Sequence, residues 1–308
     1  MLAVVAPGQG SQTPGFLAPW AELPGVAERL AALSAATGLD LRELGTSAGA
    51  DTIRDTAVAQ PLLVGAGLAA LPEVLPDVEA AAVVAGHSVG EVTALAATGV
   101  LSADEAGRLV AVRATAMARA AARTATGMTA VLGGDPDEVV AAAAAAGVVV
   151  ANANGAGQVV VAGTTEQLAA FAAAPPAKAR VVPLAVAGAF HTEHMAPAVA
   201  ALAEHAAALQ PGRPRTALLS NRDGEVVEDG RDALDRLVAQ VARPVRWDLC
   251  LERMAALGVT GLLELPPAGT LAGIAKRALP GVEVVALKSP DDLDRARALV
   301  AAHAGVAQ

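Results

Sequence analysis

The sequence has very little cysteine and very few aromatic residues. Of its 308 residues, one is Cys, two are Trp, three are Phe and none is Tyr. The single Cys250 can form no internal disulfide and cannot supply a cysteine-based zinc site. The scarcity of rings argues against stacking surfaces for single-stranded nucleic acid and predicts a core of Ala, Val and Leu. This cysteine usage favours a reducing, cytoplasmic compartment.

Basic charge is scarce as well. The chain carries 22 Lys and Arg against 31 Asp and Glu, a formal net charge of -9, without a long basic run. Because nucleic-acid binding needs an overall or local basic excess, no nucleic-acid partner is expected. The longest apolar run, residues 139–151, contains Gly147 and is shorter than the roughly 20 residues that span a bilayer. The first residues also lack the basic segment of a secretory signal, so no membrane association is expected.

Short apolar runs alternate with amphipathic or Ala-rich stretches, which predicts an α/β protein. The middle of the chain has the order strand, helix, strand, strand, helix, strand, which is typical of a ferredoxin-like unit. Its elements are expected at residues 128–132, 135–146, 148–152, 158–162, 164–173 and 179–186. We therefore predict a small domain over residues 127–187, inserted into a larger α/β domain formed by residues 1–126 and 188–308. In the larger domain, helices are expected at residues 191–209 and 244–257.

The sharpest motif is Gly86-His87-Ser88-Val89-Gly90, which follows a Val-rich predicted strand and precedes a predicted helix. A G-x-S-x-G turn between a strand and a helix exposes the serine hydroxyl and aims free N–H groups at any oxyanion formed there. Ser88 is therefore a candidate nucleophile. The alternative is a chance Gly/Ser turn, since the chain contains 30 Gly.

A serine nucleophile needs a base, and His191 is the best placed of the five histidines. It follows a predicted strand and begins a predicted helix, where catalytic side chains tend to lie. His191 and His194 could also share a metal ion, but no third ligand is visible, so no metal site is expected. No acid between Ser88 and His191 stands clearly at a strand end. A Ser–His pair oriented by a backbone carbonyl and a triad with an acid both remain open.

Several further motifs stand in order along the chain. The main ones are Gly8-Gln9-Gly10-Ser11-Gln12, the serine motif with Glu91, Arg113, and Ala189-Phe190-His191-Thr192. Together they resemble the malonyl-CoA:acyl carrier protein transacylases of type II fatty acid synthesis, which are related to the acyltransferase domains of polyketide synthases. Shorter matches at residues 59–61, 152–154, 158–163, 244–247 and 271–277 extend the resemblance over nearly the whole chain.

The resemblance implies an α/β-hydrolase-like large domain carrying the ferredoxin-like insert. It also implies a role for each matching residue. Ser88 would take the malonyl group as an ester, and His191 would act as base and then as acid. The remaining implied site residues are Gln9 and Val89 (backbone oxyanion hole), Arg113 (malonyl carboxylate), Met117, Phe190, Gln60 and Asn154 (substrate binding) and Arg246 (main-chain carbonyl that orients the histidine). Without the resemblance, Arg113 would be interpreted as a surface arginine like Arg108 or Arg119.

The implied reaction is ping-pong transfer from malonyl-CoA to the phosphopantetheine thiol of an acidic acyl carrier protein, with no bound cofactor and with a monomeric enzyme. The Phe190 ring is similar to that of malonyl-selective members, where it crowds an α-methyl branch. The rival interpretations are a serine hydrolase or esterase, a non-catalytic docking member of the family, and a polyketide rather than a fatty acid carrier as partner. Candidate docking cations are Lys276 with Arg277, Lys178 with Arg180, Arg213 with Arg215, and Arg243 with Arg246.

Overall fold

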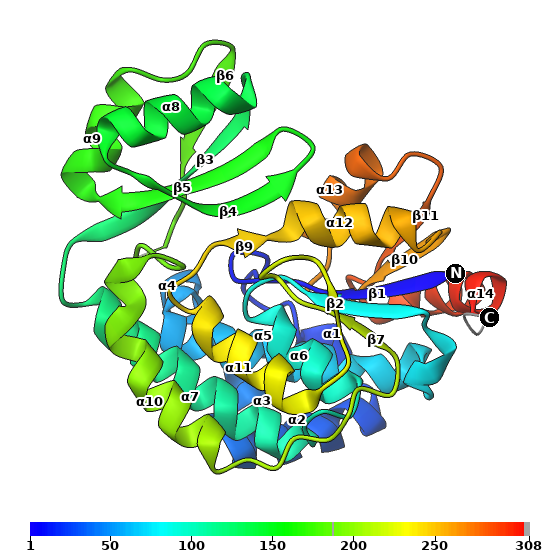
Figure 1. Cartoon of the computed structure of the whole chain (residues 1–308). Coiled ribbons are helices and arrows are strands. Elements are labelled where there is room, and N and C mark those ends of the chain that lie inside the picture. Colours follow the sequence, from blue (N-terminus) through cyan, green and yellow to red (C-terminus); the bar gives the residue numbers. More distant parts are fainter. Residues whose placement is uncertain (187, 305–308) are drawn as a thin grey trace.

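The computed structural model describes residues 1–186 and 188–304 of the chain. The predicted end of the insert at residue 187 and the last four residues of the predicted larger domain lie outside this part. The described residues form a mixed α/β fold with two sheets, one below the other in Figure 1. The larger sheet has the order β11-β10-β1-β2-β7-β8, and all neighbours are parallel except β7 and β8. Its strands are β1 (Leu2–Ala6), β2 (Val83–Gly86), β7 (Ala217–Leu219), β8 (Val226–Val227), β10 (Gly261–Glu264) and β11 (Glu283–Ala286).

Strand β1 is buried on both sides, and its alternate side chains divide between two cores. Leu2, Val4 and Ala6 pack into the larger core, whereas Ala3 and Val5 pack into a second core on the opposite face. The second core is covered by α12 (Trp247–Ala256) and α13 (Thr270–Ala278). The helices that contribute to the larger core are α1 (Ala18–Ala21), α2 (Pro24–Thr37), α3 (Leu41–Thr46), α4 (Ala50–Arg54), α5 (Thr56–Val74), α6 (Gly90–Ala97), α7 (Ala103–Ala121), α10 (Ala196–Ala207), α11 (Gly230–Gln240) and α14 (Leu293–His303).

The middle of the chain forms the smaller sheet, drawn in green at the upper left of Figure 1. Its elements follow the predicted order: β3 (Thr126–Gly133), α8 (Pro136–Ala146), β4 (Val149–Gly155), β5 (Gln158–Thr164), α9 (Thr165–Ala173) and β6 (Ala179–Pro183). The strands lie in the order β6-β3-β5-β4 and are antiparallel. Helices α8 and α9 cover one face and share a small core that includes Val139, Val161 and Phe171.

Two predicted helices begin later than expected. The segment predicted as a helix from Pro244 starts instead with β9 (Val245–Arg246), which pairs with β4 of the smaller sheet, and only then enters α12. This pairing between distant segments overrides the local helical pattern. The segment predicted as a helix from His191 has His191 in a non-helical turn, then a short 3-10 turn (Glu193–Met195), then α10. Two other 3-10 turns lie at Val78–Ala80 and Pro290–Asp292.

Helix α5 is apolar along most of its length. Among the described residues it is the one helix with the length and hydropathy of a membrane span, and 78% of its apolar window is buried inside the protein. It packs against α2, α6 and α7. These are the properties of a central core helix.

Candidate active site

Ser88 lies in a sharp turn between β2 and α6 and has a left-handed backbone conformation, with φ of 53°. The two motif glycines allow this turn because there is no room for a side chain at either position. A Cβ on Gly86 would lie 1.9 Å from the backbone of Gly90, and a Cβ on Gly90 would lie 2.2 Å from the carbonyl oxygen of Ala6. The predicted sequence of strand, elbow and helix is therefore confirmed, and it presents the Ser88 hydroxyl at the edge of the sheet.

The turn that contains Gln9 lies beside this elbow because β1 and β2 are parallel neighbours, with Ala6 paired to Gly86. Their carboxyl ends therefore reach the same edge of the sheet. Gln9 and Val89 line the cleft that contains Ser88. Within the described part of the chain, neither main-chain N–H donates a hydrogen bond to another protein group. Both remain available to an oxygen atom bound beside the serine.

The His191 ring is hydrogen-bonded to the Ser88 hydroxyl. Its Nε2 lies 2.7 Å from the Ser88 hydroxyl, and its Nδ1 lies 2.8 Å from the main-chain carbonyl oxygen of Gln240. A carbonyl can only accept, so Nδ1 carries the proton and Nε2 accepts from the serine. Burial, followed by the positive charge of Arg113, lowers the pKa of His191 to about 3. The ring is therefore neutral at physiological pH and able to take a proton from Ser88.

The carbonyl that orients His191 belongs to Gln240, so the prediction of Arg246 for this role was wrong. Gln240 is the last residue of α11, and the final carbonyls of a helix have no partner within it. Arg246 lies in β9. Its guanidinium forms an ion pair with Asp248 at 2.8 Å, and its main-chain N–H donates to the main-chain carbonyl of Asn221.

Arg113 lies on α7 with 1% of its surface exposed, which corrects the interpretation as a surface arginine. Its Nη1 donates to Gln60 Oε1 at 2.5 Å and its Nη2 to Gln240 Oε1 at 2.8 Å; Nη2 also lies 3.5 Å from the Ser88 hydroxyl. Both strong partners are neutral amides, and no carboxylate of the described residues pairs with Arg113. Burial lowers the pKa of Arg113 to about 10, so it stays charged at neutral pH. An unneutralised cation therefore faces the nucleophile, a suitable place for a substrate carboxylate.

The cleft above Ser88 has a volume of about 520 Å³. The larger part of the chain and the smaller sheet both contribute walls to it: Met117 and Phe190 come from the former, Met128 and Val160 from the latter. All the predicted site residues except Arg246 line it: Gln9, Gln60, Ser88, Val89, Arg113, Met117, Asn154, Phe190 and His191. These roles came from the resemblance, and the fold brings the residues together from six separate segments.

Asn154 connects the elbow to the smaller sheet. Its Oδ1 lies 2.8 Å from His87 Nε2, and the His87 ring packs edge-on against Trp247 at 5.7 Å between centroids. His87 therefore points away from the Ser88 hydroxyl and holds β4 against the elbow. His191 and His194 form no metal site with a third group, since residues 1–186 and 188–304 contain no cluster of three potential ligands.

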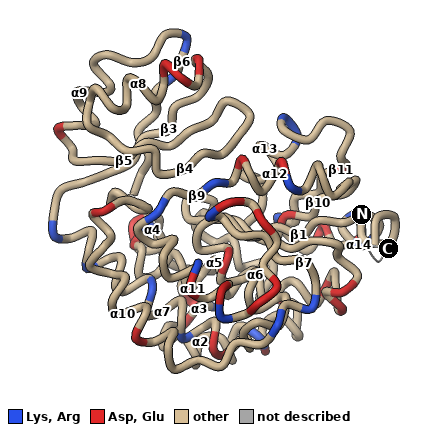
Figure 2. The backbone as a smooth tube through the Cα atoms, in the orientation of Figure 1, with Lys and Arg blue, Asp and Glu red and all other residues tan. Residues whose placement is uncertain are grey.

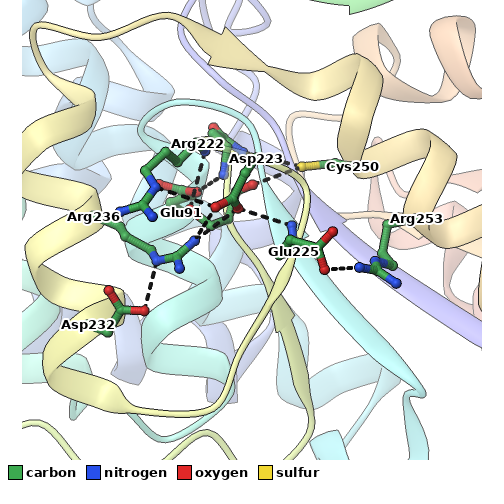
Figure 3. A network of polar contacts seen from close by, with 10 residues as sticks. Glu91, Arg222, Asp223, Glu225, Asp232, Arg236, Cys250 and Arg253 are labelled. Atoms are coloured by element: carbon green, nitrogen blue, oxygen red, sulfur yellow. Dashed lines mark hydrogen bonds and ion pairs between the residues drawn. The ribbon is translucent and has the colours of Figure 1, made fainter.

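The sequence analysis missed a buried polar cluster beneath the elbow. Asn221 accepts from the Ser88 N–H at 2.8 Å, and Gln240 Nε2 lies 2.6 Å from Glu91. Burial raises the pKa of Glu91, whereas the hydrogen bond from the Asn221 N–H and the positive charge of Arg113 favour its charged carboxylate form. Figure 3 shows Glu91 close to Asp223 and Arg236, which form an ion pair at 2.8 Å. Glu91 directly follows the serine motif, but no local pattern distinguishes Asn221 or Gln240.

The fold and this site together define an acyltransferase: a serine on an elbow with a neutral histidine, two free amides and a cation for the acyl group. The chain belongs to the acyl transferase domain family, whose pattern matches residues 4–299.

Named relatives are similar over the full length. A Mycobacterium tuberculosis (strain H37Rv) protein named malonyl CoA-acyl carrier protein transacylase is 53% identical over 297 residues, which cover 96% of this chain and 98% of the relative. The crystal structure of MCAT from Mycobacterium tuberculosis superposes with a TM-score of 0.92 at 52% identity, covering 96% of this chain and 99% of that one. A malonyl-transacylase solved in complex with a type II PKS acyl-carrier protein has a TM-score of 0.89 at 32% identity, with 96% and 99% coverage.

Proposed function

We propose that this acyltransferase moves the malonyl group from malonyl-CoA to the phosphopantetheine thiol of an acyl carrier protein, through an ester on Ser88. The observation that carries the proposal is the charged Arg113 guanidinium 3.5 Å from the Ser88 hydroxyl, which is held by neutral amides and by no carboxylate of the described residues. A malonyl group bound there would place its carboxylate on Arg113 and its thioester carbonyl at the serine. The names of the relatives support the same substrate and partner.

The reaction has two half-reactions through a Ser–His dyad. In the first, Ser88 Oγ attacks the thioester carbonyl while its proton moves to His191 Nε2. The oxyanion accepts hydrogen bonds from the main-chain N–H groups of Gln9 and Val89. Collapse breaks the C–S bond, and the leaving CoA sulfur takes the proton from His191. In the second half-reaction, the carrier thiol gives its proton to His191, attacks the ester carbonyl and releases Ser88 with its proton restored. The Gln240 carbonyl stabilises the imidazolium that exists between these transfers.

Selectivity follows from the walls around the acyl group. Arg113 favours an acyl group that carries a carboxylate, because a buried cation is stabilised more by an anion than by neutral groups. Phe190, 5% exposed, lies next to His191 and would crowd an α-methyl branch. An acyl group fixed in this way, in a largely apolar cleft, would favour attack by the thiol over attack by water.

Carrier docking is proposed at the side of the cleft formed by the smaller sheet and α13. Arg180 and Arg277 line a shallow groove that shares Gln158 with the cleft, and Arg277 lies 3.4 Å from the Gln158 side chain. The other candidate cations line neither. Figure 2 shows basic and acidic residues interspersed over the chain, so a local pair of cations is the feature available to an acidic partner.

We propose a monomeric, cytoplasmic enzyme that needs no bound cofactor, since the thioester arrives as substrate and the phosphopantetheine on the carrier. The domains are proposed as an α/β-hydrolase-like body and a ferredoxin-like insert. The strand order β6-β3-β5-β4 supports the insert.

Intact-protein mass spectrometry tests the proposed function. The protein is incubated briefly with malonyl-CoA, methylmalonyl-CoA or acetyl-CoA, and peptide mapping locates the adduct. A malonyl adduct on Ser88 that carrier protein removes is the expected result. Free CoA without an adduct would favour a hydrolase, and neither adduct nor free CoA would favour a non-catalytic docking protein.

A further inference from the structure

The side-chain amide of Gln240 is held in one orientation by its neighbours. Its Oε1 accepts from Arg113 Nη2 at 2.8 Å. Its Nε2 lies 2.6 Å from Glu91 Oε2, 3.0 Å from Asn221 Oδ1 and 3.2 Å from the carbonyl oxygen of Ser88. These three oxygens all accept hydrogen bonds, so the amide nitrogen must face them and the amide oxygen must face the guanidinium.

Glu91 is the residue that determines this orientation. One of its carboxylate oxygens accepts from the main-chain N–H of Asn221 and the other from Gln240 Nε2. A carboxylate can accept at both oxygens, whereas a carboxamide at this position would set an NH2 group against one of the two donors. The group is 6% exposed, so a mismatch would find little water to relieve it.

Gln240 serves the site through two different parts. Its main-chain carbonyl orients His191, and its side chain holds Arg113. The first contact survives any substitution at this position, whereas the second depends on the amide. The base and the anion-binding group can therefore be separated by experiment.

We infer that the Gln240 side chain, oriented by Glu91, is a positioning residue that sets Arg113 for substrates with a carboxylate. This rests on the proposed function. A neutral amide holds the guanidinium without cancelling its charge. A carboxylate in the same place would form an ion pair with Arg113 and compete with the carboxylate of the acyl group.

The test compares Gln240→Met and Gln240→Glu with Asp235→Asn, an exposed change on the same helix. Single-turnover acylation of Ser88 is measured with malonyl-CoA and with acetyl-CoA. Both Gln240 variants should lose roughly 10- to 100-fold in malonyl transfer, the range expected for one hydrogen bond to a charged group. Acetyl transfer should stay near the wild-type rate, and Asp235→Asn should match the wild type with both substrates.

An equal loss with both acyl groups would overturn the inference, because a merely structural role slows both. An unchanged preference for malonyl would overturn it as well. Glu91→Gln provides a second test and should shift the preference in the same direction, so the question remains decidable if a Gln240 variant folds poorly. Absence of malonyl acylation in the wild type would instead refute the proposed function itself, which keeps the two failures distinct.

Discussion

The Ser88 hydroxyl and the His191 ring meet at 2.7 Å although both residues have left-handed backbone conformations, with φ of 53° and 63°. Such a conformation costs a non-glycine residue roughly 1–2 kcal/mol. The surrounding contacts hold each residue in place: Asn221 accepts from the Ser88 N–H, and the Val241 carbonyl accepts from the His191 N–H at 3.2 Å. The reacting pair is thus fixed by strained turns on two separate segments.

This strain predicts that removing the nucleophile with glycine gives a more stable protein than removing it with alanine. Both Ser88→Gly and Ser88→Ala lose the hydroxyl and should show no acylation. Glycine adopts positive φ freely, but it also gives the unfolded chain more conformational entropy. After both effects are counted, the free energy of unfolding of Ser88→Gly should exceed that of Ser88→Ala by about 0.5–1 kcal/mol. Urea denaturation of the two variants measures the difference. Equal stabilities would mean that the turn carries no such strain.

The motif glycines are expected to be far less tolerant than other glycines of the chain. Gly90→Ala would place a Cβ 2.2 Å from the Ala6 carbonyl oxygen, and relief would require moving β1 or the elbow. We expect a loss of about 3 kcal/mol or more in stability, together with activity.

Gly273→Ala is the matched control for that change. Gly273 lies inside α13 with open space around its missing side chain, so alanine there should stabilise by about 0.5–1 kcal/mol. Thermal unfolding and acylation rates of both variants show whether only the elbow glycine is sensitive to an added methyl group or whether any glycine of the chain is. Similar effects of the two substitutions would contradict the steric argument.

Local patterns located most of the elements, but not β9 and not the partners of the site residues. The G-x-S-x-G motif identified the elbow, and the order of apolar runs and helical stretches identified the elements of the smaller sheet and its two helices. The local sequence does not show that Arg113 faces inward, because its hydrogen-bond partners, Gln60 and Gln240, lie on two helices distant in the sequence. The resemblance supplied that residue.

The same limit explains the error over Arg246. The resemblance at residues 244–247 led to the prediction that Arg246 contacts the histidine. The residue that makes this contact is Gln240, six positions earlier. The Gln240 carbonyl can accept from His191, in addition to the Arg243 N–H, because α11 ends at Gln240, and helix ends are among the least certain features of a sequence. The strand β9 was missed for a related reason, since its partner β4 lies about ninety residues earlier.

Loss of the buried cation should change which acyl group the enzyme prefers. Arg113→Ala removes the guanidinium that lies 3.5 Å from the Ser88 hydroxyl, so malonyl acylation should fall by at least about 100-fold while acetyl acylation changes little. The matched control is Arg119→Ala, an exposed arginine of the same helix. Competition between malonyl-CoA and acetyl-CoA, read by mass spectrometry of the adducts, gives the ratio directly. Retained malonyl preference in Arg113→Ala would refute the assigned role.

The lowered pKa of His191 predicts how stability depends on pH. The unfolded ring titrates near 6.5 and the folded ring at about 3, so between these values the unfolded state binds more protons. Wild-type stability should therefore fall as the pH is lowered through this window, by up to about 1.4 kcal/mol per pH unit from this group.

A His191→Gln variant lacks that contribution but keeps the other titrating groups. The difference in free energy of unfolding between wild type and variant should shrink steadily from pH 6.5 towards pH 4. Denaturation series at four or five pH values measure it. A constant difference across the window would show that the folded ring titrates normally.

The groove beside Gln158 predicts an effect confined to the second half-reaction. Arg277→Glu should lower the rate at which carrier protein discharges malonyl-Ser88 by about tenfold at low salt, because it reverses a charge that an acidic partner would meet. Acylation by malonyl-CoA, which needs no carrier, should stay at the wild-type rate. Added salt should narrow the difference in discharge rate between wild type and variant, since exposed charges are screened within about 10 Å at 0.1 M.

Arg295→Glu, an exposed change on α14 that lines neither the groove nor the cleft, is the control for the added negative charge. An equal slowing by both variants would mean that overall charge governs the encounter, and no slowing by either would mean that shape guides docking.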